Sequence, residues 1–507
     1  MKNSDVDHGY AWVVLFFCSV NYFIIAGGVK SFGVLYTELL DRYDDGAGNT
    51  AWISSVNSFL MMGLGPISNY LGEIYTYRFI MVIGSIVNLI GYTASAFVTR
   101  MEFLYITYGI ISGTGYGLMF APSTTIVSFY FEKRRSLANV IVVSVSGIGA
   151  FLFPYLIRLL VDTYGLNGTF LIMGGIYFHT CTASLFLIQP AHFPYQKKST
   201  ENHAIMKRKP DINVCSSFRK ILMRMFKPSL FRNPKFTIYL MAMFLQVANF
   251  ASNGLILPAQ TRALGFGKES ITVAVSLVGA SEIFARAFLG WFADLNIVKR
   301  VHLFMMCSFV SGLTPFCMPF LPYLPAIYTY AVVVGSFSGS FWSLMGVLII
   351  DCIGIKNYSP AFGLMSLINA TAFCISQPFS GWLDDTTGSW SASYYFTGVL
   401  SILSFLSCLM VPLVERIWCF NFKEHDNNLE NHEVEIEESI CLYKENHTIH
   451  DLTNNSIVQA VDHTSSEENV IRIILCVTPA ILNFCSPVVI SVPNVSLKDW
   501  MLQTYIP

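Results

Sequence analysis

The sequence predicts an all-α membrane protein with twelve transmembrane helices in two six-helix halves related by pseudo-symmetry. Hydrophobic residues make up 53% of the chain and charged residues only 12%, whereas soluble domains carry roughly 25% charged residues. Twelve apolar runs approach the length of about 20 residues that crosses a bilayer core. Short motifs also recur six runs apart. The net charge of −1 gives no reason to expect a nucleic-acid partner.

Each predicted span is an apolar run bounded by polar residues, glycine or proline. The runs cover residues 10–36, 51–71, 78–98, 103–129, 139–160, 168–188, 236–257, 270–293, 301–320, 326–350, 360–382 and 394–414. They predict an N-terminal half at 10–189 and a C-terminal half at 236–416. A short N-terminal segment at 1–9 precedes the N-terminal half.

The remaining segments are polar and are expected in the cytoplasm. The loop 190–235 contains eleven Lys and Arg against Glu201 and Asp211. The tail 417–507 is acidic, with twelve Asp and Glu between residues 421 and 468, and is expected to be mostly disordered. Its apolar stretch 470–495 contains Arg472, Asn483 and three prolines, which disfavour a thirteenth span. We expect that stretch to be surface-associated or loosely packed.

Basic residues set the expected orientation, because short cytoplasmic loops carry an excess of Lys and Arg. Both termini are therefore expected in the cytoplasm. We also interpret several loop residues as part of a cytoplasmic gate. The inner-loop residues on which this orientation depends are Arg78, Lys133, Arg134, Arg135, Lys299, Arg300 and Lys356.

Two short motifs repeat at an offset of six spans. Residues 65–69 and 290–294, the latter ending in Asp294, share the pattern G-x-x-x-[DN]. Residues 162–165 and 385–388 share D-T-x-G. Such a repeat predicts two parallel halves, a site between them near the bilayer midplane, and rocking of one half against the other. Asp294 joins the basic loop residues as a predicted gating residue.

Lys30, Glu282 and Arg286 are charged side chains that lie away from the ends of predicted spans, where each costs at least ~2.5–3.5 kcal/mol on insertion scales. Lys30 is either a fixed cation for a substrate carboxylate or a lysine that extends to the headgroups. Glu282 and Arg286 are spaced i, i+4 and share one helix face. Glu282 is a candidate proton carrier and Arg286 a bidentate carboxylate ligand, unless the two form only a structural pair.

Other polar residues in spans have less specific interpretations. Gln246, Asn249 and Asn253 follow at i, i+3 and i+7, and they either line a polar cavity or join helices by hydrogen bonds. Arg158 and Asp162 are interpreted as an interfacial ion pair. The sequence shows no metal-ligand cluster, phosphate-binding loop or catalytic triad, so we expect no metal, no cofactor and no enzyme activity.

Several of these motifs resemble the monocarboxylate transporter (solute carrier 16) family of the major facilitator superfamily. Residues 7–12 (DHGYAW) and 130–139 (YFEKRRSLAN) match the family's two signatures, the second more closely. Lys30 lies where proton-coupled members carry a substrate-binding lysine. Glu282 and Arg286 match an acid-x-x-x-Arg motif in which those members carry Asp, and Gly346 stands where they usually carry Phe. The resemblance covers roughly residues 5–418 and implies the major facilitator fold.

The resemblance implies proton-coupled symport of a monocarboxylate across the plasma membrane by alternating access. Lys30 and Arg286 then bind the small organic anion, and Glu282 couples it to protons. A single-span glycoprotein is a further partner to consider, because some members need one for surface delivery. Glu282 and the small Gly346 favour an alternative, a proton-independent carrier of a larger organic anion or aromatic amino acid. A non-transporting sensor that signals through the acidic tail is a third hypothesis.

Overall fold

The computed structural model describes residues 8–43, 45–131, 135–188, 230–231, 233–295, 297–339, 341–354 and 358–411, with 491–492 and 495–496. The chain divides into two compact units, residues 1–417 and 418–507. In the second unit, the described residues form an antiparallel pair of short strands, β1 (Ser491–Val492) and β2 (Val495–Ser496). The rest of the predicted acidic tail and most of the predicted loop 190–235 lie outside the described residues.

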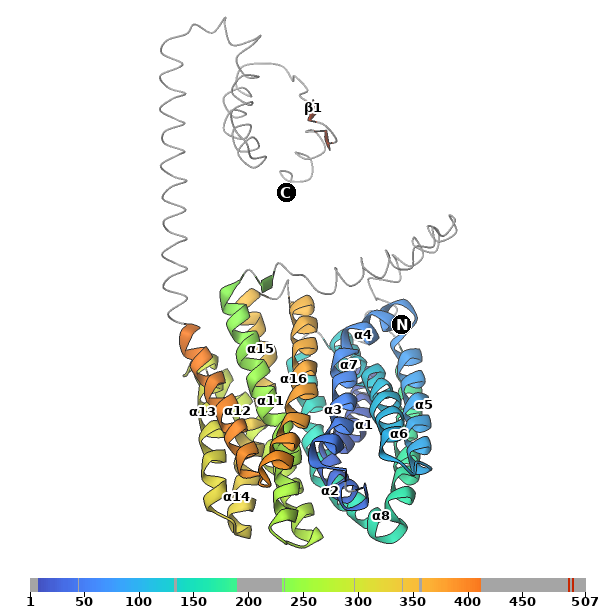
Figure 1. Cartoon of the computed structure of the whole chain (residues 1–507). Coiled ribbons are helices and arrows are strands. Elements are labelled where there is room, and N and C mark those ends of the chain that lie inside the picture. The colour runs from blue at the N-terminus through green and yellow to red at the C-terminus, as the bar shows by residue number, and fades with distance from the viewer. Residues whose placement is uncertain are drawn as a thin grey trace, which may run out of the picture. The chain divides into compact units, whose positions relative to one another are not determined.

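The N-terminal half is a bundle of helices that run back and forth along a common direction (Figure 1). The first rod bends at Ser31 and the second at Leu64. The elements are α1 (Tyr10–Lys30), α2 (Phe32–Tyr43), α3 (Ala47–Gly63), α4 (Gly65–Ile74), α5 (Tyr77–Ala96), α6 (Met101–Leu104), the π-helix η2 (Tyr105–Ser112), α7 (Gly113–Tyr130) and α8 (Arg135–Leu185).

The C-terminal half repeats this arrangement beside the first (Figure 1). A π-helical segment interrupts its fourth rod. The elements are α11 (Pro234–Ala263), α12 (Lys268–Asp294), α13 (Arg300–Cys317), the 3-10 helix η4 (Met318–Phe320), α14 (Leu324–Val333), the π-helix η5 (Val334–Ser338), α15 (Phe341–Ile353), α16 (Tyr358–Thr387) and a last helix, Ser391–Val411.

Eight helices in the described residues are long and apolar enough to cross a membrane. One of them lies in α8, which bends at Gly165, where φ is +66°, so α8 supplies two rods. Three further rods are assembled from shorter consecutive helices: α3–α4, α6–η2–α7 and α14–η5–α15. The predicted all-α membrane protein is confirmed. The first rod is longer than expected because α2 continues to Tyr43.

The two faces of α12 show how the helices suit a bilayer. Phe284, Phe288 and Trp291 are 76%, 58% and 60% exposed and lie along one side of the helix. Glu282 and Arg286 lie on the opposite side and are buried. Exposed aromatic side chains and buried charges are the reverse of a water-soluble helix, and they indicate a lipid-facing surface.

Glycines bring the two halves into close contact along α8–α12, α3–α16 and α2–α11. A Cβ atom on Gly279 of α12 would lie 2.5 Å from the carbonyl carbon of Ala150 and 2.6 Å from the amide nitrogen of Phe151 in α8. A Cβ atom on Gly381 of α16 would lie 2.6 Å from the backbone of Ala47. Small residues that let helix backbones approach are typical of membrane helix contacts.

We predict that Gly279→Ala destabilises the protein by about 1–3 kcal/mol, because the overlapped atoms are backbone and cannot rotate away. Gly290→Ala is the matched control on the same helix, since a Cβ atom there meets no atom within 4 Å. Alanine is the better helix former by roughly 0.5–1 kcal/mol, so the control should be neutral or stabilising. Thermal unfolding of the detergent-solubilised variants measures both effects, and equal melting temperatures would contradict the close contact.

Candidate functional site

Three charged side chains meet where α1 of the N-terminal half faces α12 of the C-terminal half. The Lys30 ammonium donates to both carboxylate oxygens of Glu282, at 2.7 and 2.6 Å. Arg286 forms an ion pair with the same carboxylate from one turn further along α12. Glu282 is 1% and Arg286 7% exposed. We call Lys30, Glu282 and Arg286 the central charge cluster.

Ser146 of α8 connects the two cations of the cluster. Its Oγ atom accepts from Arg286 Nη1 at 3.0 Å and lies 3.4 Å from Lys30 Nζ. The Ser146 hydroxyl donates to the Val143 carbonyl at 2.7 Å, and Arg286 Nη1 donates to that carbonyl at 3.2 Å. The guanidinium of Arg286 therefore reaches across the boundary and binds the N-terminal half.

The break between α14 and α15 completes the surroundings of the cluster. The Gly339 carbonyl accepts from Arg286 Nε at 3.4 Å and Nη2 at 3.2 Å. A Cβ atom on Gly339 would lie 3.1 Å from Glu282 Cγ, so glycine permits the chain to approach the acid. Gly339 follows the π-helix η5, and such irregular turns are frequent at functional sites.

The central charge cluster has two cations and one carboxylate, and so one positive charge more than it neutralises internally. Burial makes an unneutralised charge expensive. Hydrogen bonds from Ser146 and two backbone carbonyls stabilise the cations only in part, because these acceptors are neutral. The cluster is therefore suited to bind a small anion, whose charge would neutralise the surplus.

The family model of the Major Facilitator Superfamily matches residues 18–251 and 239–418 of this chain. The chain belongs to the major facilitator superfamily. This membership agrees with the helical halves and with the position of the central charge cluster between them. Substrate sites of such transporters lie near the membrane midplane, between structural repeats.

Several curated relatives of the chain are monocarboxylate transporters. The chain is 26% identical to Monocarboxylate transporter 12 of Xenopus laevis over 82% of this chain and 92% of that protein. It is 28% identical to Monocarboxylate transporter 4 of Mus musculus over 86% and 89%. It is also 24% identical to Monocarboxylate transporter 14 of Homo sapiens, over 82% and 92%. The predicted relationship to the monocarboxylate transporter family is confirmed.

A solved POT family transporter in complex with 5-aminolevulinic acid shares the fold. Its TM-score is 0.60 at 14% identity, over 78% of this chain and 95% of that chain. The family match and the monocarboxylate transporter relatives identify a multi-pass transporter of the major facilitator superfamily rather than an enzyme.

The polar stripe on α11 makes hydrogen bonds between and within helices. Gln246 donates to Ser311 at 3.0 Å. Asn249 donates to Ser338 at 3.2 Å. Tyr330 donates to Asn253 at 2.5 Å. All three stripe residues are at most 2% exposed. The sequence left two interpretations open: the hydrogen bonds between helices are present, and the lining of a cavity stays a prediction.

The predicted gating residues are placed only in part. Lys133 and Arg134 lie outside the described residues. Arg135 begins α8 and Asp294 ends α12. The side chains of these two residues lie outside the described part of the structure. Gly346 lies in α15 and is half-buried, so its predicted effect on the size of the site stays a prediction.

Sequence reasoning missed the pairing of Lys30 with Glu282 and the roles of Ser146 and Gly339. Lys30 and Glu282 are 252 residues apart, and no local pattern joins them. Ser146 is one of several serines in an apolar helix, and Gly339 is one of many glycines. The repeat at six-span spacing was the available signal, because it predicts a site between the two halves, to which charged residues of both can contribute.

We predict that Lys30→Met and Glu282→Gln each destabilise the protein, and that the double variant loses less than the sum. Glu282→Gln leaves two buried cations without a carboxylate, and Lys30→Met removes one of the two partners of Glu282. The coupling should be about 0.5–3 kcal/mol, as for side chains in contact. Denaturant titration in detergent measures it. Arg300→Met with Glu282→Gln is the control pair, since Arg300 pairs with Asp351 and should give additive losses.

Proposed function

We propose that this protein is a proton-coupled symporter of monocarboxylates that works by alternating access. We place it in the plasma membrane with both termini cytoplasmic, as the basic inner loops predict. Lys30 and Arg286 are the substrate-binding residues, and Glu282 is the proton-coupling residue. The observation that carries the proposal is the single buried carboxylate held between two cations from different halves.

Substrate binding follows from the charges of the cluster. In the empty protein the Glu282 carboxylate occupies the place between Lys30 and Arg286 that a substrate carboxylate needs. A guanidinium binds a carboxylate through two parallel hydrogen bonds, and an ammonium adds a third donor. A solute with one carboxylate therefore matches the donors of the cluster.

Coupling to protons follows from the competition between the two carboxylates. When Glu282 takes up a proton, it releases both cations for the substrate carboxylate. One proton and one monocarboxylate then enter together, so the net charge of the buried cluster is unchanged. Binding the anion without the proton would leave two carboxylates beside each other, which repel in a buried site.

Proton coupling also links the occupancy of the site to the movement of one half against the other. Lys30 binds Glu282 across the boundary only while Glu282 is ionised. Protonation removes this ion pair and substrate supplies a new one, so the two facing states differ in affinity for substrate. A ligand shifts a conformational equilibrium only through such a difference.

A proton-independent carrier of a larger organic anion or aromatic amino acid is the second candidate. Glu282 has one methylene more than the Asp of proton-coupled relatives, which moves its carboxylate. Gly346 in α15 is smaller than the Phe that proton-coupled relatives usually carry there, which leaves room for a larger anion. Both proposals share the anion site and differ in whether Glu282 exchanges protons during transport.

We predict that Lys30→Ala and Arg286→Ala each lower uptake of the transported anion by roughly tenfold or more, because each removes a charged hydrogen-bond donor to the substrate. Radiolabelled lactate and a panel of larger monocarboxylates in oocytes provide the measurement, normalised to surface expression. Arg300→Ala is the matched control, because its partner Asp351 lies in an exposed pair. Undiminished transport of every tested solute by both variants would overturn the anion site.

We predict that uptake rises at mildly acidic external pH relative to neutral pH, and that Glu282→Gln abolishes this rise. Glutamine cannot exchange a proton, whereas Glu282→Asp should retain the pH dependence. Entry of the uncharged acid in oocytes without the protein is subtracted. Parent uptake that does not change with pH would support the proton-independent carrier. A rise that persists in Glu282→Gln would show that another group carries the proton.

A further inference from the structure

The repeated D-T-x-G motif marks two similar corners of the bundle, at the end opposite the one where α1 begins. We call this the distal end; it is the lower end in Figure 1. In both copies the glycine has a positive φ, +66° at Gly165 and +68° at Gly388. In both copies a threonine hydroxyl donates to the carbonyl four residues earlier, from Thr163 at 2.7 Å and from Thr386 at 2.9 Å. The two copies of the motif therefore share a local backbone conformation as well as a sequence.

The second copy of the motif caps a helix of the other half. The Asp385 carboxylate accepts from the backbone amides of Ala47 at 2.7 Å and Gly48 at 2.8 Å, the first residues of α3. Gly46 precedes α3 and has no side chain to cap these amides. A carboxylate at a helix N-terminus satisfies free amides and the helix dipole. Asp385 supplies this cap across the boundary between the halves.

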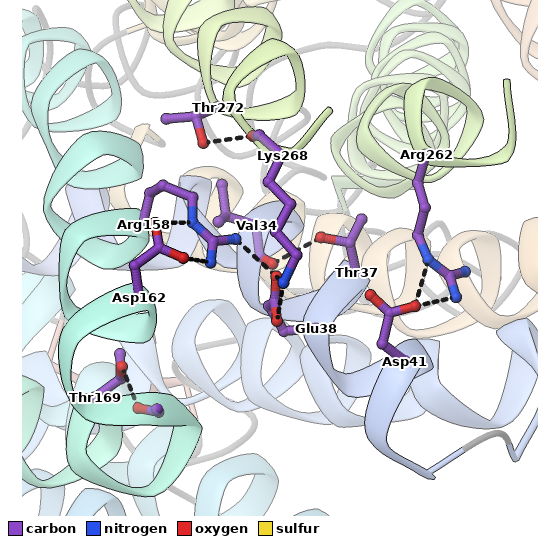
Figure 2. A network of polar contacts seen from close by, with 11 residues as sticks. Val34, Thr37, Glu38, Asp41, Arg158, Asp162, Thr169, Arg262, Lys268 and Thr272 are labelled. Atoms are coloured by element: carbon purple, nitrogen blue, oxygen red, sulfur yellow. Dashed lines mark hydrogen bonds and ion pairs between the residues drawn. The ribbon is translucent and has the colours of Figure 1, made fainter. Parts of the chain in front are cut away.

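The first copy of the motif anchors a chain of ion pairs that also crosses the boundary (Figure 2). The guanidinium of Arg158 donates to Asp162 at 2.8 Å and to Glu38 of α2 at 2.7 Å. Glu38 in turn lies 2.9 Å from the ammonium of Lys268, the first residue of α12. Glu38 and Arg158 have side chains only 13% and 10% exposed, so solvent screens this pair less than a surface pair.

A third contact also joins α2 to the C-terminal half. Arg262, near the end of α11, donates to Asp41 of α2, with Nε 2.8 Å from the nearer carboxylate oxygen (Figure 2). Each of the three contacts joins the N-terminal half to the C-terminal half at the distal end. Among the described residues, the ion pair Arg300–Asp351 links helices of the C-terminal half alone.

We propose that the two D-T-x-G corners are paired latches that hold the distal end closed and set the balance between the two facing states. The first latch consists of Glu38, Arg158, Asp162 and Lys268, and the second of Asp385 with the first amides of α3. The pair Asp41–Arg262 supports both. The central charge cluster is closed off from the distal side while the latches hold. Rocking of the halves breaks the Glu38–Lys268 pair, the Asp41–Arg262 pair and the Asp385 cap together, because each of these spans the boundary. Arg158 and Asp162 stay with Glu38 in the N-terminal half and hold its carboxylate in place.

The latches suit a reversible device because their parts become hydrated when they separate. Lys268, Arg262 and Asp41 have side chains already 56%, 38% and 46% exposed, so opening exposes them to water at low cost. The amides of α3 likewise gain water in place of Asp385. Closure is therefore favoured by a modest margin, which a substrate can reverse.

The test measures access from the distal side without any substrate, so its result is separate from that of the transport assays. Val34 is 1% exposed and lies between Lys30 and Glu38 at a spacing of four residues from each. Val34→Cys is therefore a reporter buried beneath the first latch. A membrane-impermeant maleimide is applied to right-side-out and inside-out vesicles, with the exposed Cys317 replaced by serine throughout.

We expect Asp385→Ala and Glu38→Gln each to raise the labelling rate of the reporter from the distal side by roughly three- to thirtyfold, the equilibrium equivalent of a lost cap or charged contact. Asp351→Asn, which breaks a pair within one half, should leave it unchanged. Asp41→Arg should raise labelling by repulsion from Arg262, and Asp41→Arg with Arg262→Asp should restore the parent rate. This rescue is informative even where Asp385→Ala fails to fold.

Unchanged labelling in Glu38→Gln and Asp41→Arg would overturn the latches. Equal labelling of Asp351→Asn and the latch variants would also overturn them, since it would indicate general loosening. Labelling that rises only from the side where α1 begins would overturn them as well, because the contacts would then not close the distal end.

Discussion

The structure depends on the burial of three charges at one boundary within a membrane protein. Lys30, Glu282 and Arg286 each lose hydration there, and they recover part of it only from each other, from Ser146 and from backbone carbonyls. Lys30 belongs to one half and the other two to its counterpart. The cluster is therefore complete only when the halves are together, which ties its chemistry to their relative position.

Close backbone packing makes this arrangement possible. Gly279 in α12 lets that helix lie directly on α8, and this brings Arg286 within reach of Ser146 and Val143. Gly339 lets the start of α15 approach Glu282. With larger residues at these positions the halves would lie further apart, and the distances on which the ion pairs depend would lengthen.

The central charge cluster and the distal contacts differ in exposure, and so in what they can do. Within the cluster Glu282 and Arg286 are almost fully buried and the Lys30 side chain is 20% exposed, so charge interactions there are strong and a change in protonation matters. The distal ion pairs that cross the boundary are partly exposed and individually weak. Strong interactions at the centre suit the recognition of an anion, whereas weak and numerous interactions at the end suit a boundary that must open and close.

The sequence alone determined the helical class, the approximate spans, the two-fold repeat and the three intramembrane charges. These features are local or periodic: apolar length predicts a span, and a spacing of four places Glu282 and Arg286 on one helix face. The motif at 385–388 was visible as a repeat, although its role as a cap was not.

Only the tertiary structure decided which of these residues meet. Lys30 and Glu282 lie on helices whose facing is set by glycine contacts between halves, and Asp385 reaches α3 across 338 residues of chain. The stripe of Gln246, Asn249 and Asn253 showed the same limit, because a helical period states which residues share a face but not what that face contacts. Partners distant in sequence are chosen by the packing of whole helices, which no local pattern encodes.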